Sequence, residues 1–380
     1  MLSRRSLLST APLLTLAAAA ACAGPSPRRG GGPRPLRGAL AVRGADLSSL
    51  PQEEAAGRRF GDAGRTGPAE RLLAARGATA VRLRVWVDPG PDGFGLAAAL
   101  HLARRAHAAG LRVVLDLHYS DSWADTAHQT TPKAWAGQDL RRLAATVRDY
   151  TRDVVEAFAA QRTPADMVQI GNEISHGMLW PHGRIDAPGR EERWDGFRTL
   201  LAAGLRGAAE ASAPPRTAVH IDAGGDNARA RRFYDHLAAA GVPFDVIALS
   251  YYPFWHGSLA ALQYNLTDLA ARYGKDVLVA ETAYPWKLPA DDGCIVTRAD
   301  QLPDVARFPA TPAGQAAYFE ALRALLADLP GGRGLGFLAW EPAWVPGVRA
   351  NRRQERLYAN LTMFDWSGAG LPSLAAFRPR

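Results

Sequence analysis

The chain has 380 residues, 47% of them hydrophobic, so it can bury a large core and does not have the composition of a disordered protein. Its formal net charge is +8, but the arginines are scattered and no lysine-rich block is present. We interpret this excess as a solvated surface and expect no nucleic-acid partner. The length suits either one α/β barrel or two smaller domains.

The first residues are typical of an export signal. Arg4 and Arg5 precede an apolar stretch over residues 7–21, which is too short to span a bilayer as a mature helix, and SRRSLL resembles a twin-arginine signal. We predict a signal segment over residues 1–23 and a tether rich in Pro, Gly and Arg over residues 24–38. Two cleavage modes stay open: acylation of Cys22, which would anchor the protein to a membrane, or ordinary cleavage at the small residues 21–23. Either one predicts an exported protein.

From residue 39 to residue 380, apolar strands alternate with amphipathic helices. The expected strands cover residues 40–46, 80–87, 112–117, 167–173, 217–222, 245–251, 277–281 and 334–340. The expected helices cover residues 68–76, 96–109, 139–161, 193–211, 227–240, 259–273, 312–329 and 371–377. Eight strands in strict alternation with eight helices predict an α/β fold, a closed (β/α)₈ TIM barrel, as a single domain.

Functional side chains in such a barrel lie at the carboxyl ends of the strands. The predicted ends carry acids, arginines and aromatic residues: Asp46, Arg82, Arg84, Trp86, His118, Asn172, Glu173, Asp222, Tyr251, Glu281 and Trp340. Four more tryptophans follow strands, where their rings can stack on sugar faces: Trp123, Trp180, Trp255 and Trp286. Core packing is the alternative role of each tryptophan. The whole set predicts a carbohydrate pocket.

Glu173 and Glu281 end the fourth and seventh predicted strands, so they can face each other across a bound sugar. A separation of about 5 to 5.5 Å would make the reaction retaining. Arg82 or Arg84 could hold one glutamate ionised and Tyr251 could donate a hydrogen bond to it, which favours Glu281 as nucleophile and Glu173 as general acid. Asn172 is expected to bind the hydroxyl next to the reacting carbon. The alternative for either glutamate alone is a buried ion pair with an arginine.

Several longer motifs run in order along nearly the whole mature chain. They are GADLSSL from Gly44, VRLRVWVDP from Val81, LDLHYSDSWAD from Leu115, PKAW from Pro132, IGNEISHGMLWPHG from Ile170, GGDN from Gly224, FDVIALSYYPFWHG from Phe244, YGKDVLVAETAYPW from Tyr273 and WEPAW from Trp340. Together they resemble glycoside hydrolase family 53, the arabinogalactan endo-β-1,4-galactanases, a family in a large clan of retaining barrels.

This resemblance implies retaining cleavage of internal β-1,4-galactosyl bonds in pectic (arabino)galactan, with a polysaccharide as the partner. It implies Glu173 as the acid/base and Glu281 as the nucleophile. It also implies a set of substrate-cleft residues: His118, Asp121, Trp123, Trp180, Tyr251, Trp255 and Trp340. We expect a monomer that requires no cofactor.

The chain also departs from the family pattern. The run from Tyr358 to Leu361 replaces a Trp-x-Asn-Gln pattern, and Ser175 and His176 stand where two asparagines are common. Some bacterial members bind calcium after the seventh strand, and here Asp291 and Asp292 are the candidate ligands, although no regular series of oxygen ligands surrounds them. A calcium site and an ordinary loop stay open there.

Two other functions remain compatible with the sequence. The same barrel could cut another β-1,4-glycan, such as a mannan or a glucan, because the two glutamates do not distinguish these substrates. A surface lipoprotein that binds galactan without cutting it is the second alternative, but a binder has no need of both glutamates.

Overall fold

A computed structural model describes residues 40–90, 93–186, 189, 191–288, 293–346 and 356–379. Eight parallel strands form a closed barrel, in which each strand pairs with the next and the last pairs with the first. They are β1 (Val42–Asp46), β4 (Ala80–Val85), β5 (Arg112–Leu117), β6 (Met167–Ile170), β9 (Arg216–Ile221), β10 (Val246–Ser250), β11 (Asp276–Thr282) and β12 (Gly334–Ala339). The predicted (β/α)₈ barrel is confirmed.

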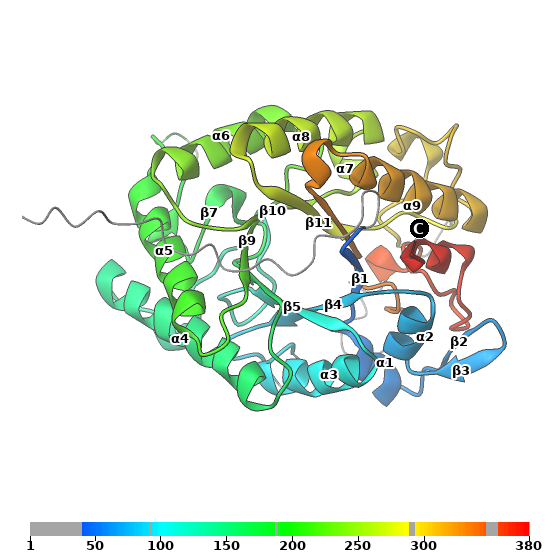
Figure 1. Cartoon of the computed structure of the whole chain (residues 1–380), viewed down its shortest axis with the longest axis horizontal. Helices are drawn as coiled ribbons and strands as arrows, with labels where there is room; N and C mark the ends of the chain where they lie inside the picture. The colour runs from blue at the N-terminus through cyan, green and yellow to red at the C-terminus, as the bar shows by residue number, and fades with distance from the viewer. Residues whose placement is uncertain are drawn as a thin grey trace, which may run out of the picture. The chain divides into compact units, whose positions relative to one another are not determined.

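The helices form a ring outside the barrel, as Figure 1 shows. They are α2 (Ala69–Ala75), α3 (Leu96–Ala108), α4 (Leu140–Ala160), α5 (Trp194–Glu210), α6 (Asn227–Ala239), α8 (Leu259–Tyr273) and α9 (Pro312–Ala327). The last predicted helix is a 3₁₀ segment, η6 (Pro372–Phe377). Predicted and observed ends agree within two residues except at β6, which stops at Ile170 and not at Glu173.

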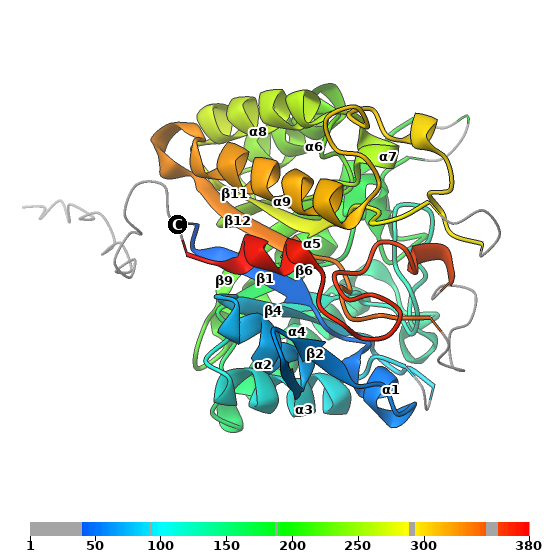
Figure 2. The same ribbon diagram turned by 90° about the vertical axis from the view of Figure 1, so that its right-hand side faces the viewer.

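Several short elements in the loops escaped the sequence pattern because they are too short for a hydrophobic period to develop. Between β1 and α2 lie α1 (Leu50–Ala55) and an antiparallel hairpin of β2 (Phe60–Asp62) and β3 (Arg65–Gly67). Before α8 lies α7 (Pro253–His256), and after η2 (Ile174–His176) lies the two-residue pair β7 (Gly177–Met178) and β8 (Gly183–Arg184). In Figure 2, α7 lies at the opposite end of the barrel from the C-terminus.

The side chains inside the barrel change character from the amino ends of the strands to their carboxyl ends. A buried apolar cluster that includes Ala80, Val114, Met167, Ala218 and Ala248 fills the lower interior. Because side chains on one face of a strand recur every two residues, the next inward positions are polar and buried. They are Arg82, Asp116, Gln169, His220 and Ser250. The barrel therefore has an apolar floor below a polar layer.

Outside the strands, the helices bury their apolar stripes in a second, larger core. Helix α4 is representative: Asp139 caps its first turn by accepting a hydrogen bond from the backbone of Arg142, and Leu143, Val147 and Phe158 lie on its buried face. The described residues of the barrel belong to one compact unit. Within the described part of the chain, no helix combines the length and the apolar character that crossing a membrane requires.

Candidate active site

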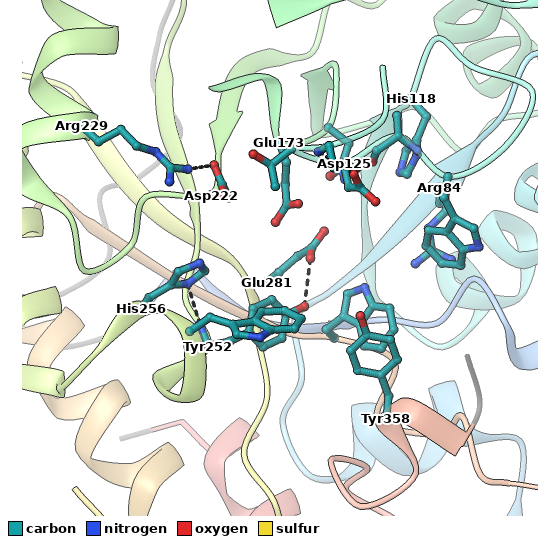
Figure 3. Close-up of a pocket in the computed structure, with 17 residues that line it drawn as sticks. Arg84, His118, Asp125, Glu173, Asp222, Arg229, Tyr252, His256, Glu281 and Tyr358 are labelled. Carbon is teal, nitrogen blue, oxygen red and sulfur yellow. Dashed lines mark hydrogen bonds and ion pairs between the residues drawn. The ribbon is translucent and has the colours of Figure 1, made fainter. Parts of the chain in front are cut away.

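A cavity of about 460 Å³ opens above the polar layer of the barrel. Its lining residues come from the carboxyl ends of the strands and from the loops and helices that follow them: Arg84, His118, Trp123, Ala124, Asp125, Thr126, Ala127, Asn172, Glu173, Asp222, Arg229, Tyr252, Trp255, His256, Glu281, Trp340 and Tyr358. Nine of the residues that the sequence singled out are among them: Arg84, His118, Trp123, Asn172, Glu173, Asp222, Trp255, Glu281 and Trp340. The carboxyl groups of Glu173 and Glu281 point toward each other in Figure 3.

Glu281 lies near the end of β11 and is held by a cation and a hydroxyl. The Nη1 atom of Arg82 lies 2.8 Å from one carboxylate oxygen, and the hydroxyl of Tyr252 donates to the other at 2.9 Å. The sequence prediction that Tyr251 is this donor is wrong, because its buried hydroxyl donates to the carbonyl of Gly257. Neighbouring side chains of an extended segment point to opposite sides. Tyr251 therefore points into the core, and the next residue, Tyr252, points into the cleft.

Arg82 does not line the cavity but lies behind it, fully buried. Its guanidinium also pairs with Asp46 and with Asp116, each at 3.0 Å. These neighbouring carboxylates raise the pKa of Arg82 despite the opposing effect of its burial, so the cation is permanent. Asp46 is likewise buried, where it accepts hydrogen bonds from Ser48 and Arg82. Both residues support the cleft from below and are not placed to touch a substrate.

Glu173 reaches the cavity because the chain turns sharply after β6. Gly171 has φ 82° and Glu173 has φ 47°, both in the left-handed region. At Gly171 a Cβ atom would lie 2.6 Å from the side chain of Ile174, so this position also needs glycine for space. The turn explains why the strand is three residues shorter than predicted.

The two glutamates differ in their electrostatic surroundings. Burial, followed by the nearby charges of Glu281 and Asp222, raises the pKa of Glu173 well above its ordinary value. Burial raises the pKa of Glu281 as well, but Arg82 and the hydroxyl of Tyr252 both lower it. A proton shared by the pair therefore rests on Glu173, and Glu281 is the ionised member.

Asn172 lines the cavity, but protein groups already occupy both ends of its amide. Its Nδ2 donates to the carbonyl of Ala124 at 2.9 Å, and its Oδ1 accepts from Arg82 at 2.8 Å. These bonds fix the orientation of the side chain next to Glu173. Its contact with a sugar hydroxyl stays a prediction.

Aromatic rings form one wall of the cavity. Trp340 packs against Tyr358 with ring centroids 4.4 Å apart, and Trp123 carries the guanidinium of Arg84 over its face at 4.3 Å. Trp255 is 50% exposed, which is unusual for so large an apolar side chain. Exposed rings at the edge of a polar cavity are suited to stacking on sugar rings.

Four other predicted substrate residues do not line this cavity. Trp86 is buried against Phe94 and Trp123 and donates to His118, and the carboxylate of Asp121 accepts from two backbone N–H groups and so shapes its loop. Trp180 donates to the carbonyl of His176. Trp286 packs edge-on against Trp366.

Eight residues of the cavity were not predicted as site residues: Ala124, Asp125, Thr126, Ala127, Arg229, Tyr252, His256 and Tyr358, the last of which was named only as a departure from the family pattern. Asp222 and Arg229 form an ion pair at its edge, which Figure 3 shows. Tyr252 could have been predicted, because it is the next residue after Tyr251, which was predicted. Of the others, Arg229 lies at the start of α6, His256 is the last residue of α7, Tyr358 lies in a helical turn after β12, and the rest lie in a loop. No hydrophobic period in these short segments distinguishes a lining side chain from a solvated one.

No cluster of three or more His, Cys, Asp or Glu side chains that could hold a metal ion occurs among the described residues. The two candidate calcium ligands, Asp291 and Asp292, lie outside the described residues. Cleavage of a glycosidic bond by two carboxyl groups requires no cofactor.

A family model and individual relatives match the chain over nearly the same residues. The model of the family described as "Glycosyl hydrolase family 53" matches residues 42–377. A Niallia circulans protein described as an uncharacterized protein in the bgaB 5′ region is 41% identical over 343 residues, which cover 89% of this chain and 93% of the relative. The probable arabinogalactan endo-β-1,4-galactanase A of Aspergillus terreus is 40% identical over 350 residues, which cover 89% and 90%.

A solved structure agrees with these relatives. The GH53 catalytic domain of Ignisphaera aggregans superposes with a TM-score of 0.82 at 34% identity, covering 91% of this chain and 98% of that domain. The family match spans most of the chain, and the relatives align over nearly their whole length. The chain therefore belongs to glycosyl hydrolase family 53 and is a glycoside hydrolase.

Proposed function

We propose that this protein hydrolyses internal β-1,4-galactosidic bonds of pectic (arabino)galactan with retention of configuration. Relatives that include the Aspergillus terreus protein are named for this activity. The observation that carries the mechanism is the contrast between the two facing carboxyl groups. Glu281 is paired with Arg82, whereas Glu173 forms no ion pair with a basic side chain in the described part of the chain.

In the first step, Glu281 attacks the anomeric carbon while Glu173 gives its proton to the departing glycosidic oxygen. This forms a galactosyl ester on Glu281 and leaves Glu173 as a carboxylate. Because the ester carries no charge, one cause of the raised pKa of Glu173 has then gone. Glu173 next takes a proton from water, which attacks the anomeric carbon from the side that the leaving group vacated. The second inversion restores the original configuration.

The aromatic wall supports an endo mode of attack. The wall contains rings from different parts of the barrel rim. Trp255, whose ring is exposed, lies on α7, whereas Trp340 and Tyr358 follow β12. Rings on separated loops are suited to a chain that crosses the cleft, so that bonds within a polymer can reach the two glutamates.

The test is the release of reducing ends from β-1,4-galactan, β-mannan and carboxymethylcellulose by the protein and by its Glu173→Ala and Glu281→Ala variants. We expect release from galactan alone and its loss in both variants. Turnover of mannan or cellulose in place of galactan would refute the substrate assignment but keep the mechanism. Galactan binding without turnover would refute the hydrolytic function.

We also propose that the protein is exported and acts on polymer outside the cytoplasm. The support is the Arg4-Arg5 pair followed by an apolar stretch, together with a substrate too large to enter a cell intact. Fractionation of a producing culture tests this, with a Cys22→Ala variant to decide whether membrane association depends on acylation. Activity confined to the cytoplasm would refute export.

A further inference from the structure

The cavity has two unlike sides. Figure 3 shows His118 and Tyr358 on one side of the two glutamates and three polar side chains on the other. These three are Asp222 after β9, Arg229 in the first turn of α6, and His256 at the end of α7, and we call them the polar wall. The two-step reaction itself uses none of the three.

A backbone contact fixes the hydrogen of the His256 imidazole. The backbone N–H of Tyr252 donates to Nδ1 of His256 at 3.0 Å, so Nδ1 is an acceptor and carries no hydrogen. Burial lowers the pKa of His256 to about 4, so near neutral pH the ring holds a single hydrogen, which is on Nε2. Within the described parts of the chain, no group accepts this hydrogen. The Nε2 atom is therefore a free hydrogen-bond donor on a residue that lines the cavity.

The ion pair of Asp222 and Arg229 supplies the other polar atoms of this wall. The Nη2 atom of Arg229 contacts Oδ1 of Asp222 and lies 3.4 Å from the hydroxyl of Ser175, which donates to the same carboxylate oxygen. The second carboxylate oxygen of Asp222 and the Nη1 atom of Arg229 have no hydrogen-bond partner among the residues that the structure describes. The polar wall thus offers one acceptor and two donors.

The backbone that carries the polar wall is tightly packed. A Cβ atom at Gly225 would lie 1.7 Å from the carbonyl oxygen of His256, so the loop after β9 lies directly against α7 and needs glycine there. From α8, the fully buried amide of Asn265 donates to the carbonyls of Ala223 and Gly224, each at 2.8 Å. Donors and acceptors that are already fixed lose little conformational entropy when a ligand binds.

The polar wall has the chemistry to bind a neutral sugar. A sugar hydroxyl both donates and accepts a hydrogen bond, so neighbouring hydroxyls match a set of two donors and one acceptor. The charge of Arg229 is balanced by that of Asp222, with which it is paired, and the imidazole of His256 is uncharged near neutral pH. The wall therefore has no net charge that would favour an acidic sugar.

The strand order indicates which sugar of the substrate this wall faces. Asn172, the predicted contact of the sugar that is attacked, is bonded to Arg82 on β4 and to Ala124 after β5. The two neighbours of β6 are β5 and β9, so the polar wall lies on the other side of Glu173 from these bonds. We infer that the polar wall binds the sugar that leaves with the protonated glycosidic oxygen, and that Nε2 of His256 donates to one of its hydroxyls. This inference rests on the proposed hydrolysis of galactan.

The test fills the side of the attacked sugar first. An aryl 2-deoxy-2-fluoro-β-galactobioside should form an ester on Glu281 that water cleaves slowly, and mass spectrometry detects this ester. Added β-1,4-galactobiose then accepts the fluorosugar, so the rate at which activity recovers measures how well galactobiose binds on the leaving side. In His256→Ala, the galactobiose concentration for half-maximal recovery should rise by about 3- to 10-fold.

Two further variants separate binding from a structural role of the same ring. His256→Gln keeps a donor near the position of Nε2 and should restore most of the affinity for galactobiose. His256→Asn keeps only an acceptor for the backbone N–H of Tyr252 and should not restore it. The reverse order would show that the ring serves only to hold α7, and this outcome or an unchanged affinity in all three variants would overturn the inference.

Failure of the proposed function would give a different result. If no ester forms on the unaltered protein, retaining hydrolysis is refuted, and binding alone then judges the inference. Nitrogen-15 NMR of the imidazole rings in the unaltered protein, with His256→Gln used only to assign the signal, reads which ring nitrogen carries the hydrogen. We expect hydrogen on Nε2 and a shift of this signal when galactotetraose is added. Hydrogen on Nδ1, or a signal that galactotetraose leaves in place, would overturn the inference even if a variant does not fold.

Discussion

One glutamate, Glu173, follows β6 and another, Glu281, lies near the end of β11, but the surroundings of the two side chains differ. At β11, Glu281 is bonded to a permanent cation, Arg82, and to the hydroxyl of Tyr252. In the turn after β6, Glu173 faces the carboxylates of Glu281 and Asp222, and none of the basic side chains that the structure describes pairs with it. Two identical side chains therefore have opposite roles, one as the ionised nucleophile and one as the protonated acid, because the neighbouring charged and hydroxyl groups differ.

The largest effect is expected when the two glutamates are removed in turn. Glu281→Ala should lose roughly 10⁴-fold or more in turnover, because no ester can form. Added azide fits into the space of a missing carboxylate and should rescue both variants on an aryl galactooligosaccharide, but with opposite products. Glu281→Ala should give an α-galactosyl azide and Glu173→Ala a β-galactosyl azide, which proton NMR of the products distinguishes.

The product of Glu173→Ala has the β configuration because its ester still forms on Glu281, and azide then attacks from the opposite face. If Glu173→Ala gave the α product and Glu281→Ala the β product, the two roles would have to be exchanged. Absence of rescue in the presence of normal folding, checked by circular dichroism, would count against a covalent intermediate.

The next largest effect tests the role of Glu173 as the general acid. Glu173→Gln cannot give a proton, so we expect turnover of galactan to fall by about 10²- to 10⁴-fold. An aryl galactoside with a good leaving group needs little protonation, so its first step should be nearly as fast as in the unaltered protein. Pre-steady-state release of the phenol measures that step, and an equal loss on both substrates would contradict the role of Glu173 as acid.

The fold could be predicted from the sequence because long-range order in a barrel is a repetition of local patterns. The helix over residues 259–273 and the strand over residues 112–117 were predicted with their observed ends, since each has a clear period and turn residues at its borders. The strand end before Glu173 was not, because an apolar run does not show where the backbone turns left-handed.

The site was predicted less completely, for a geometric reason. The position at a predicted strand end was enough to place Glu173, Glu281 and Trp340 at the cavity. It did not distinguish residues that line the cavity from residues buried below it, such as Asp46 and Arg82. Both groups are polar and both lie on inward-facing positions, and only depth along the barrel axis separates them. Residues from loops and helix starts, such as Arg229, carry no such positional signal.

A smaller effect tests whether Tyr252, and not its neighbour Tyr251, donates the hydrogen bond to Glu281. Tyr252→Phe removes a hydrogen bond that lowers the pKa of Glu281, so this pKa should rise. Glu281 must be ionised to attack, and activity is lost as the pH falls through its pKa. The acidic limb of kcat/KM should therefore move to higher pH by about one unit.

Tyr251→Phe is the matched control for that variant. It loses only a bond to the carbonyl of Gly257, so it should cost about 1 kcal/mol in the free energy of unfolding by urea and leave the pH profile in place. If the two variants exchanged these results, the observed position of the tyrosine hydroxyls would be wrong.

The smallest effect concerns the rim of the cleft, which both glutamates share. Trp255 is 50% exposed and contributes little to the core, so Trp255→Ala should leave the free energy of unfolding nearly unchanged. Loss of one stacking face should weaken the binding of a galactooligosaccharide to the Glu281→Ala variant by about 3- to 10-fold, measured by calorimetry. Trp255→Phe keeps a ring and should recover most of this affinity. Because Trp255 carries no charge, its removal takes no charge away from the two glutamates, so both limbs of the pH profile should stay in place. A moved limb would show that Trp255 also alters the electrostatics of the acid.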